Sequence, residues 1–426
     1  MATIKPFKAL VYNREKIKDL SKVICPPYDV ISPARQQYYH TLDPHNFIHI
    51  LFGKDIPGED KYLRASQNFT RWQKDCVLIN DEKPAFYFYS HQYGFRGEKR
   101  IRLGFIGLLR LDNERSTVFG HENTHTEPKE DRLKLIRQVK ANLSPIFVLF
   151  PDQKRIIQRV YQQNIIGNKP FIETSGSDNE IHKLWRIDSP DALYAIESSL
   201  AQERIFIADG HHRYEVACAY RDEMKQSPGP EVNCDALNYI MAYFTNTESR
   251  GLTVMATHRL VTFPAPIDFA RFSAGVSDLF ELEPIKDKRR FFFLLEKGGR
   301  SEHVLGVYAR NQYGLLRLRN VKILEKFIHD KPPEYRALDV AILNHLVLKK
   351  VLGLEHLDNK VVDFSQDAEE LIARADKSDC CVAFFLNPVK VDQIMAVALT
   401  GTKMPPKSTF FYPKVASGLV INKLGT

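Results

Sequence analysis

The stretch "IADGHHRYEVA", residues 207–217, places an acid, a glycine, two histidines and an arginine directly after an apolar run. The preceding residues "ERIFIA" (203–208) predict a short buried strand. The following "RYEVACAYRDEMK" (213–225) has apolar residues at helical spacing and predicts a helix. Asp209 and Gly210 then form a tight turn, and His211, His212 and Arg213 lie on the first helical turn. Free backbone N–H groups and the positive end of the helix dipole favour an anion there.

Two other interpretations of this turn compete with an anion site. Asp209 could be an ordinary helix cap, with the histidines solvated or bound to nearby backbone. Capping does not explain two histidines and an arginine, however, because three potential cations at a helix N-terminus are unfavourable at the positive end of the helix dipole. Zinc is the other alternative, but adjacent histidines point in different directions on a helix, and no CxxC or HxxxH partner is present. The residues favour an anion or phosphate site.

The composition is that of an ordinary globular protein, with 44% hydrophobic and 26% charged residues. At 426 residues the chain is long enough for two or more lobes. No apolar run approaches the length of a membrane span, and the N-terminal "MATIKPFKALVY" lacks a signal-peptide core, so we expect a cytoplasmic protein. Six cysteines without framework spacing are expected to be reduced, at positions 25, 76, 218, 234, 380 and 381.

The net charge of +8 permits nucleic-acid binding but does not indicate it, because the basic residues are interleaved with acids. The one dense basic run, "KDKRRFFF" (286–293), is interpreted either as a solvated strand edge or as a patch for polyanions. Small phosphorylated ligands explain a mildly basic surface equally well.

Strand and helix patterns alternate along the chain. "PAFYFYSHQY" (84–93) and "RIRLGFIGLLRL" (100–111) predict paired strands, and "GLTVMATHRLV" (251–261) predicts one strand. Ser32 and Pro33 begin a predicted helix, and residues 60–78 predict an amphipathic one. Strands, helices and antiparallel hairpins mixed in this way indicate an α+β, or mixed α/β, fold.

Polar clusters follow several of the apolar segments, where α/β proteins place ligand sites. Asp29 in "PPYDV" is either a turn-forming residue or a carboxylate on a stiff proline support, suited to a general base. The segment "HENTHTEPKEDR" (121–132) is either a surface loop with helix-capping acids or a binding loop. In the second case Lys129 and Arg132 would hold phosphates, and Glu122 or Glu127 would hold Mg²⁺ or a substrate ammonium group.

A further cluster pairs "THR" (257–259) with "PPKSTFFYPK" (405–414), where basic and hydroxyl residues suit phosphate oxygens or are simply surface residues. The chain has no GxxxxGK[ST] loop, no GxGxxG between a strand and a helix, and no GxSxG elbow. A P-loop, a Rossmann nucleotide site and a serine-hydrolase elbow are therefore not supported.

The chain resembles the bacterial and archaeal domain-of-unknown-function 1015 family. The resemblance rests on motifs that run in order along almost the whole chain: "ICPPYDVIS", "NFIHI", "GHENTHTEPKEDRLKLI", "ANLSPIFVLF", "IADGHHRYEVA", "GLTVMATHR" and "MPPKSTFFYPKVASGLVI". The "ADGHHRYEVA" motif is also similar to that of ParB/sulfiredoxin-like proteins, among them free L-serine kinases. Their motif forms a strand–turn–helix phosphate cradle.

This resemblance implies a small-molecule kinase that makes O-phosphoserine from free L-serine, with ATP, ADP or pyrophosphate as donor and with Mg²⁺. Phosphoryl transfer needs alignment, cations opposite the phosphates and a carboxylate near the attacking hydroxyl. We assign catalytic roles to Asp29, as the base, His211 and Glu122. The residues expected to bind the donor phosphates are Asp209, Gly210, His212, Arg213, Lys129, Arg132, Arg259 and Lys407. The residues expected to bind the substrate are Asn46, His121, Thr124 and His258, and Glu127 is expected to bind Mg²⁺.

The "CPPYDV" segment resembles the proline-rich strand that carries the acidic catalytic residue in these kinases. The small kinases keep this motif close to the "ADGHHRYEVA" motif, whereas about 180 residues separate the two here. The resemblance therefore predicts a ParB/sulfiredoxin-like lobe over residues 1–264, with a large insertion at about 46–200. It also predicts a second lobe over 265–426, whose terminal segment (404–422) returns to the site. Two other functions compete with a kinase. One is a nucleotide-gated ParB-like DNA-binding protein, although no helix-turn-helix is evident after residue 217. The other is a metal-dependent hydrolase using His121, His125, His211 and His212.

Overall fold

The computed structural model describes residues 2–112, 116–124, 126–176, 179–226, 235–354 and 361–424, so that His125 and Cys234 lie outside the described residues. The chain forms two compact units. The first contains Met1–Gly120, Thr124–Thr253 and Pro413–Thr426, and the second contains His121–Asn123 and Val254–Tyr412. The division thus falls near residue 253, where the sequence predicted 264, and the last residues belong to the first unit. The mixed α/β class is confirmed.

The first unit is built on a nine-stranded sheet of order β6-β11-β8-β12-β5-β4-β10-β9, with β1 pairing β5. Two neighbouring pairs, β6 with β11 and β8 with β12, are parallel, and the others are antiparallel. The strands are β1 (Ile4–Lys5), β4 (Phe86–Phe95), β5 (Glu98–Arg110), β6 (Val118–Gly120), β8 (Ile146–Phe150), β9 (Ile172–Ser175), β10 (Ile181–Ile187), β11 (Ile205–Asp209) and β12 (Tyr239–Asn246).

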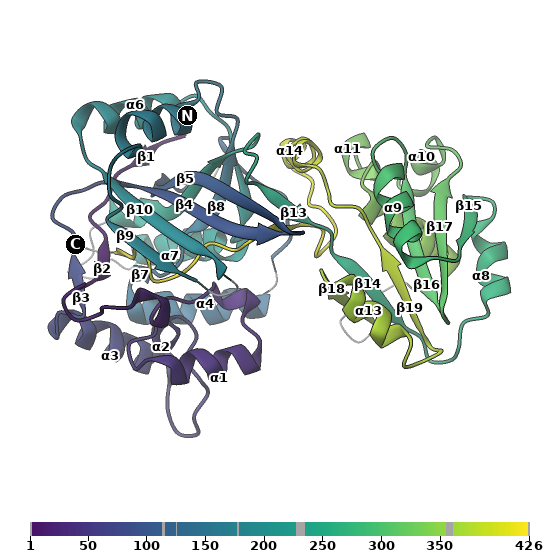
Figure 1. Cartoon of the computed structure of the whole chain (residues 1–426), viewed down its shortest axis with the longest axis horizontal. Coiled ribbons are helices and arrows are strands. Elements are labelled where there is room, and N and C mark those ends of the chain that lie inside the picture. Colours follow the sequence, from purple (N-terminus) through teal and green to yellow (C-terminus); the bar gives the residue numbers. More distant parts are fainter. Residues whose placement is uncertain are drawn as a thin grey trace. The chain divides into compact units, whose positions relative to one another are not determined.

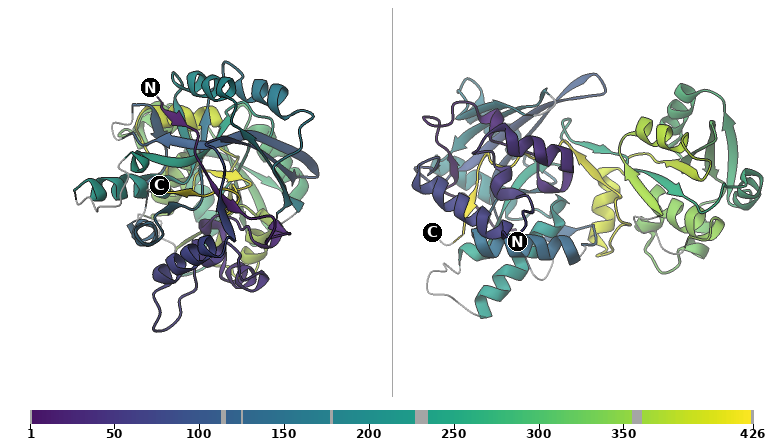
Figure 2. Two further views of the ribbon diagram at one scale, coloured as in Figure 1. Left: turned by 90° about the vertical axis from the view of Figure 1, so that its left-hand side faces the viewer. Right: turned by 90° about the horizontal axis from the view of Figure 1, so that it is seen from below.

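Helices cover both faces of this sheet. Helix α6 lies on one side, and the N-terminal helices and α4 lie on the other (Figures 1 and 2). The helices are α1 (Pro33–Leu42), α2 (Ile48–Leu51), α3 (Lys61–Lys74), α4 (Thr126–Val139), α5 (Ile156–Val160), α6 (Pro190–Leu200) and α7 (His211–Gln226), with a π-helical turn at Tyr161–Ile165. Shorter 3₁₀ turns occur at Leu20–Lys22, Tyr28–Val30 and Ala236–Asn238, and two small sheets pair β2 (Leu10–Tyr12) with β3 (Leu78–Asn80) and β7 (Ala141–Asn142) with β21 (Asn422–Lys423).

The predicted strand pair at the centre of the sheet is confirmed as the hairpin of β4 and β5. Its two-residue turn is Arg96–Gly97, and both residues have positive φ, as the twist of a tight hairpin requires. Phe86, Tyr87, Phe88 and Tyr89 are each fully buried, because this strand is covered on both faces. The hairpin therefore supplies a rigid base for the side chains that project from it.

The second unit has a six-stranded antiparallel sheet of order β15-β17-β16-β19-β14-β18. The strands are β14 (His258–Thr262), β15 (Phe280–Ile285), β16 (Val304–Ala309), β17 (Gln312–Leu318), β18 (Val362–Ser365) and β19 (Cys381–Phe385); β13 (Thr253–Met255) and β20 (Phe410–Tyr412) form a separate pair. The helices are α8 (Phe269–Val276), α9 (Lys288–Gly298), α10 (Ile323–Phe327), α11 (Pro333–Arg336), α12 (Asp339–Ile342) with a π-helical continuation at Leu343–Val351, α13 (Ala368–Ala375) and α14 (Val391–Leu399).

Two local features differ from the predicted strands. Of the two interpretations of the basic run 286–293, the strand edge is wrong, because α9 begins at Lys288: the Asp287 carboxylate accepts the Arg290 backbone N–H at 2.7 Å and Phe291 packs into the core. The predicted strand 251–261 is divided into β13 and β14. Within the described part of the chain, no helix is both long and apolar enough to span a membrane. The cysteines at positions 25, 76, 218, 380 and 381 are free thiols.

Candidate functional site

The turn between β11 and α7 has the predicted strand–turn–helix form. The register of β11 against β8 shifts between Ile207 and Asp209, so a bulge changes the direction of the strand at its last residue. Gly210 alone connects strand and helix, with φ +90°. A side chain there would also collide, since a Cβ would lie 2.9 Å from Ile146 Cγ2 and 3.0 Å from Arg213 Cζ. Both the backbone angle and the space require glycine at this turn.

We expect Gly210→Ala to destabilise the fold by more than the cost of positive φ alone, which is about 1–2 kcal/mol. The added methyl group must displace Ile146 or Arg213 as well. The measurement is the free energy of unfolding in denaturant. Gly167→Ala is the matched control, because Gly167 has φ +82° but nothing within 4 Å of a Cβ. Equal losses in the two variants would contradict the steric part of the argument.

Two cations hold the carboxylate of Asp209. Arg213 Nη2 donates to Oδ2 at 2.6 Å, and Lys414 Nζ donates to Oδ1. Arg213 also donates to the Pro145 carbonyl at 2.5 Å. The side chains of Asp209, Arg213 and Lys414 are each about nine-tenths buried. His211 is buried and His212 half-buried on the first turn of α7. The turn therefore carries a compact group of charges at a helix N-terminus.

The chain just before Asp29 pairs with the segment around Ser417. Cys25 and Ser417 exchange backbone hydrogen bonds of 3.3 and 2.8 Å, and the Ser417 hydroxyl bonds that of Ser144 at 2.6 Å. Pro27 then precedes the 3₁₀ turn Tyr28–Val30, which contains Asp29. Because Ser417 lies three residues after Lys414, one short segment supports both the Asp29 loop and the cation on Asp209.

The charges of the turn act on Asp29. Asp29 is an exposed residue, yet nearby protein atoms desolvate its carboxyl group, and this desolvation raises the pKa of Asp29. The negative charge of Asp209 raises it further, whereas Lys414 and Arg213 lower it. The structure thus brings the two predicted acids, Asp29 and Asp209, within electrostatic range of each other and of two cations.

A small cavity of about 60 Å³ adjoins this group. Tyr28, Arg132 and Arg213 contribute polar groups to its lining, and Leu135 and Ile136 are among its apolar residues. The Arg132 guanidinium lies 4.1 Å from the centre of the Tyr28 ring. Burial raises the pKa of Tyr28 to about 12, so its hydroxyl stays protonated. The cavity has room for a small chemical group beside the charges.

Three predicted residues on or beside α4 have defined partners. Thr124 Oγ1 donates to Glu215 Oε2 at 2.5 Å, and Lys129 Nζ lies 3.3 Å from the same oxygen. Arg132 is 7% exposed and donates to the Leu51 carbonyl and to Asp131, at 2.8 Å each. Lys129 is only half-buried, whereas Arg132 is occupied by structural contacts. Of these two predicted phosphate ligands, Lys129 is the more accessible.

Asn46 has a structural position that differs from the predicted substrate contact. It is fully buried, and its amide donates to the Lys22 carbonyl at 2.6 Å while its oxygen accepts the Ile48 N–H at 3.0 Å. With no exposed surface, Asn46 supports the segment that precedes the Asp29 loop. A buried amide with both ends bound to backbone positions the chain rather than a ligand.

Other predicted residues lie in the second unit. His121 Nε2 lies 3.0 Å from Thr409 Oγ1, which donates to Glu122 Oε1 at 3.4 Å. Arg259 is fully buried and donates to the Thr257 and Lys407 carbonyls, and desolvation lowers its pKa to about 9. His258 Nδ1 accepts the Leu386 N–H at 3.2 Å. Lys407 itself is exposed. Arg259 and His258 therefore serve the packing of their own unit.

Among the described residues, the predicted metal ligands are not part of a group of converging ligand side chains. Glu127 is an exposed residue in the first turn of α4, and His125 lies outside the described residues. Among the described residues, the three potential ligand side chains that converge are instead His91, Glu180 and His182. His121, His211 and His212 do not belong to that cluster, and the fourth histidine of the hydrolase alternative, His125, lies outside the described residues.

Two residues with contacts in this region, Lys414 and Glu215, were not predicted to bind a ligand. The sequence marks Lys414 only as a basic residue of segment 405–414, because its pairing with Asp209 spans 205 positions. Glu215, which binds Thr124 and Lys129, lies one helical turn after His211. That spacing was visible in the sequence and places both residues on one face of α7.

Comparison with known proteins identifies relatives at two levels. The family model described as "Protein of unknown function (DUF1015)" matches residues 4–341. No curated protein matches the chain. Among solved structures, similarity is found to a conserved hypothetical protein from Pyrococcus furiosus (12% identity, 74% of this chain and 94% of that chain, TM-score 0.33). It is also found to a free serine kinase in complex with AMP (12% identity, 75% of this chain and 90% of that chain, TM-score 0.35). A further similar structure is SbnI with a C-terminal truncation from Staphylococcus aureus (11% identity, 74% of this chain and 86% of that chain, TM-score 0.37). At these scores the likenesses do not define a function.

Proposed function

We propose that this chain, which belongs to the DUF1015 family, is a kinase that transfers a phosphoryl group to the hydroxyl of a small molecule, with free L-serine as the acceptor. The observation that carries the proposal is the grouping of Asp29 with the Asp209 turn, Arg213 and Lys414. A carboxylate and two cations at the N-terminus of a helix are the groups that phosphoryl transfer needs.

Asp29 is proposed as the general base. In this role its carboxylate accepts the proton of the acceptor hydroxyl as the oxygen attacks the phosphorus. The raised pKa of Asp29 strengthens it as a base. The prolines before Tyr28 and the Cys25–Ser417 pairing restrict the movement of its loop, which favours alignment of base and hydroxyl.

The donor's phosphates are proposed to bind at the start of α7. This helix has 16 residues, and its first N–H groups and dipole favour an anion. Arg213 and Lys414 add two positive charges, which in the free protein are paired with Asp209. Donor phosphates would share these cations with Asp209 and so bring the transferred group next to Asp29.

The cavity beside Tyr28 is proposed to hold the acceptor. Its volume of about 60 Å³ suits a small molecule rather than a nucleotide base. Its lining combines apolar residues with Tyr28 and Arg213, and the polar groups of these two residues are proposed to bind the acceptor. These features support a small polar acceptor such as an amino acid.

Magnesium is proposed to enter with the donor. The carboxylates of Asp29 and Asp209 act on each other electrostatically, and two such groups are typical of sites that hold Mg²⁺ together with substrate phosphates. When bound, the ion would neutralise charge on the phosphate oxygens. Glu127, which lies exposed on α4, is a less suitable ligand than this pair.

The test is a ³¹P NMR assay with L-serine, Mg²⁺ and ATP, ADP or pyrophosphate in separate reactions. The expected product is O-phosphoserine from at least one donor. L-threonine and glycerol serve as alternative acceptors. A phosphorylated product from these acceptors but not from serine would support the kinase activity and rule out serine as the acceptor. No phosphorylated product from any combination would rule out the kinase activity.

A further inference from the structure

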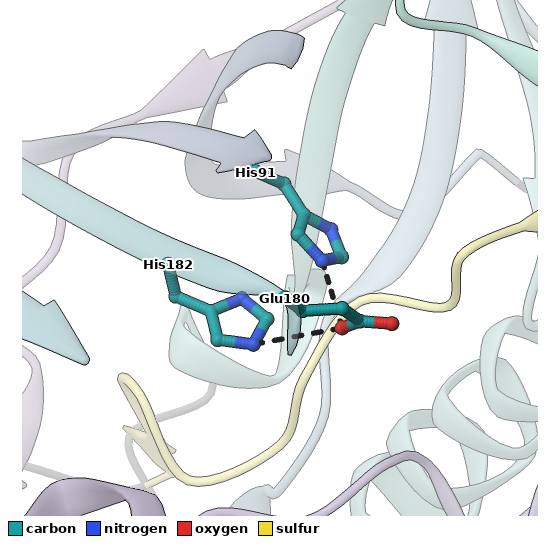
Figure 3. A group of neighbouring side chains, drawn as sticks. All are labelled: His91, Glu180 and His182. Carbon is teal, nitrogen blue, oxygen red and sulfur yellow. Dashed lines mark hydrogen bonds and ion pairs between the residues drawn. The ribbon is translucent and has the colours of Figure 1, made fainter. Parts of the chain in front are cut away.

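A second polar cluster is buried in the sheet of the first unit. His91 on β4 and His182 on β10 are directly opposite each other in the strand register, and Glu180 precedes β10. Glu180 Oε2 lies 2.9 Å from His91 Nε2 and 3.6 Å from His182 Nε2 (Figure 3). Both histidines are almost fully buried. Two histidines and a carboxylate converging in this way have the composition of a transition-metal site.

The partners of His91 contradict a metal site. Arg102 Nη2 lies 3.1 Å from His91 Nδ1, and a guanidinium can only donate. His91 Nδ1 must therefore carry a lone pair, so the proton of the neutral ring is on Nε2 and points to Glu180. Burial and the Arg102 charge lower the pKa of His91, which keeps the ring neutral. A metal ion would need the lone pair where this proton lies.

The partners of His182 lead to the same conclusion. Tyr89 Oη lies 2.7 Å from His182 Nδ1. Desolvation by burial raises the pKa of Tyr89, so its hydroxyl keeps its proton and donates it to His182 Nδ1, which places the His182 proton on Nε2, again facing Glu180. Gly176 closes this side, since a Cβ on it would lie 2.3 Å from His182 Nε2. Two N–H groups, rather than two lone pairs, face the carboxylate.

The far side of the cluster holds the C-terminal segment. Arg102 Nη2 also donates to the Pro413 carbonyl at 2.9 Å, and its guanidinium lies over the rings of Phe147 and Tyr243. Cys25 and Ser144 bind Ser417, as described above. The segment from Pro413 to Ser417 is thus fixed at both ends, and Lys414, which binds Asp209, lies between the fixed points.

We infer that His91, Glu180 and His182 form a metal-free hydrogen-bonded clamp that holds Arg102, and through it the Pro413 carbonyl, and so positions Lys414 against Asp209. Glu180 supplies the negative charge that balances buried Arg102, and His91 links the two as a neutral bridge. The clamp itself is independent of the reaction, and only the catalytic value of Lys414 rests on the proposed function. These are positioning residues.

The test is Glu180→Gln, read by ¹³C NMR titration of aspartate carboxyl carbons in the substrate-free protein. Removing the Glu180 charge by itself would lower the pKa of other acids slightly, because a negative neighbour is lost. Releasing Lys414 has the opposite sign, because Asp29 and Asp209 lose a nearby cation. We expect their pKa to rise by about 1. In a Lys414→Met background, Glu180→Gln should produce no further rise.

The matched control is Glu173→Gln, because Glu173 lies on adjacent β9 in an exposed pair with Lys183. This variant should leave the Asp29 and Asp209 titrations unchanged. If Glu180→Gln does not fold, Tyr89→Phe replaces it, since this change removes only the hydroxyl link to His182 within the clamp. Because the readout needs no turnover, it distinguishes failure of the clamp from failure of the kinase.

Two results would overturn the clamp. One is an unchanged or lower pKa for both acids in a folded Glu180→Gln or Tyr89→Phe protein. The other is stoichiometric binding of Zn²⁺, Mn²⁺ or Fe²⁺ by the purified protein that Glu180→Gln abolishes, measured by elemental analysis and calorimetry. The second result would make the cluster a metal centre.

Discussion

Asp29→Asn should lose phosphoryl transfer by a factor of about 10²–10⁴ in kcat, the usual contribution of a general base. The amide keeps the size of the side chain but cannot accept the hydroxyl proton. Binding of the donor should be largely retained, because the proposed phosphate contacts come from Arg213, Lys414 and the start of α7. The measurements are steady-state kinetics with the active donor and calorimetric titration of that donor.

Asp188→Asn is the matched control, because Asp188 is exposed between β10 and α6. It should behave as the unmodified protein in both measurements. Turnover by Asp29→Asn close to that of the unmodified protein would remove the base role. Loss of donor binding together with turnover would place Asp29 among the donor's ligands instead.

Lys414→Met should weaken donor binding by about 10- to 100-fold. A hydrogen bond to a charged group contributes about 1.5–3 kcal/mol, and each 1.4 kcal/mol is a tenfold change in affinity. The variant should also shift the acid limb of the kcat/KM profile to higher pH. Lys414 lowers the pKa of Asp29, so removing it means that Asp29 is protonated, and inactive as a base, at a higher pH.

Lys225→Met tests whether the effect belongs to the position. Lys225 is exposed in the last turn of α7, so this variant loses the same charge at the other end of the helix. Its donor affinity and its acid limb should match those of the unmodified protein. A Lys414→Met profile with an unmoved acid limb would show that Lys414 does not act on Asp29.

The sequence predicted those parts of the site that are local in the chain. The strand, the Gly210 turn and the helix that begins at His211 follow from apolar periodicity and one glycine within about 20 residues. Asp29 was identified because two prolines precede it. These features depend on residues that are close in the sequence, so the sequence alone was enough to predict them.

The parts that were missed depend on pairings between distant segments. Lys414 meets Asp209 only because the chain end returns to the first unit, and His91 meets His182 only because β4 pairs with β10. Asn46 and Arg259 look like ligands in the sequence, yet both are buried with backbone partners. Polar residue type predicts a binding role, but burial determines whether the side chain can perform it.

The return of residues 413–424 to the first unit has a consequence for biosynthesis. Strand β21 pairs with β7, Ser417 with Cys25 and Lys414 with Asp209, and all three partners leave the ribosome long before these residues do. The nascent first unit must therefore wait, with the proposed binding region incomplete, until translation has passed through the whole second unit. The proposed site is complete only when residues 413–424 dock.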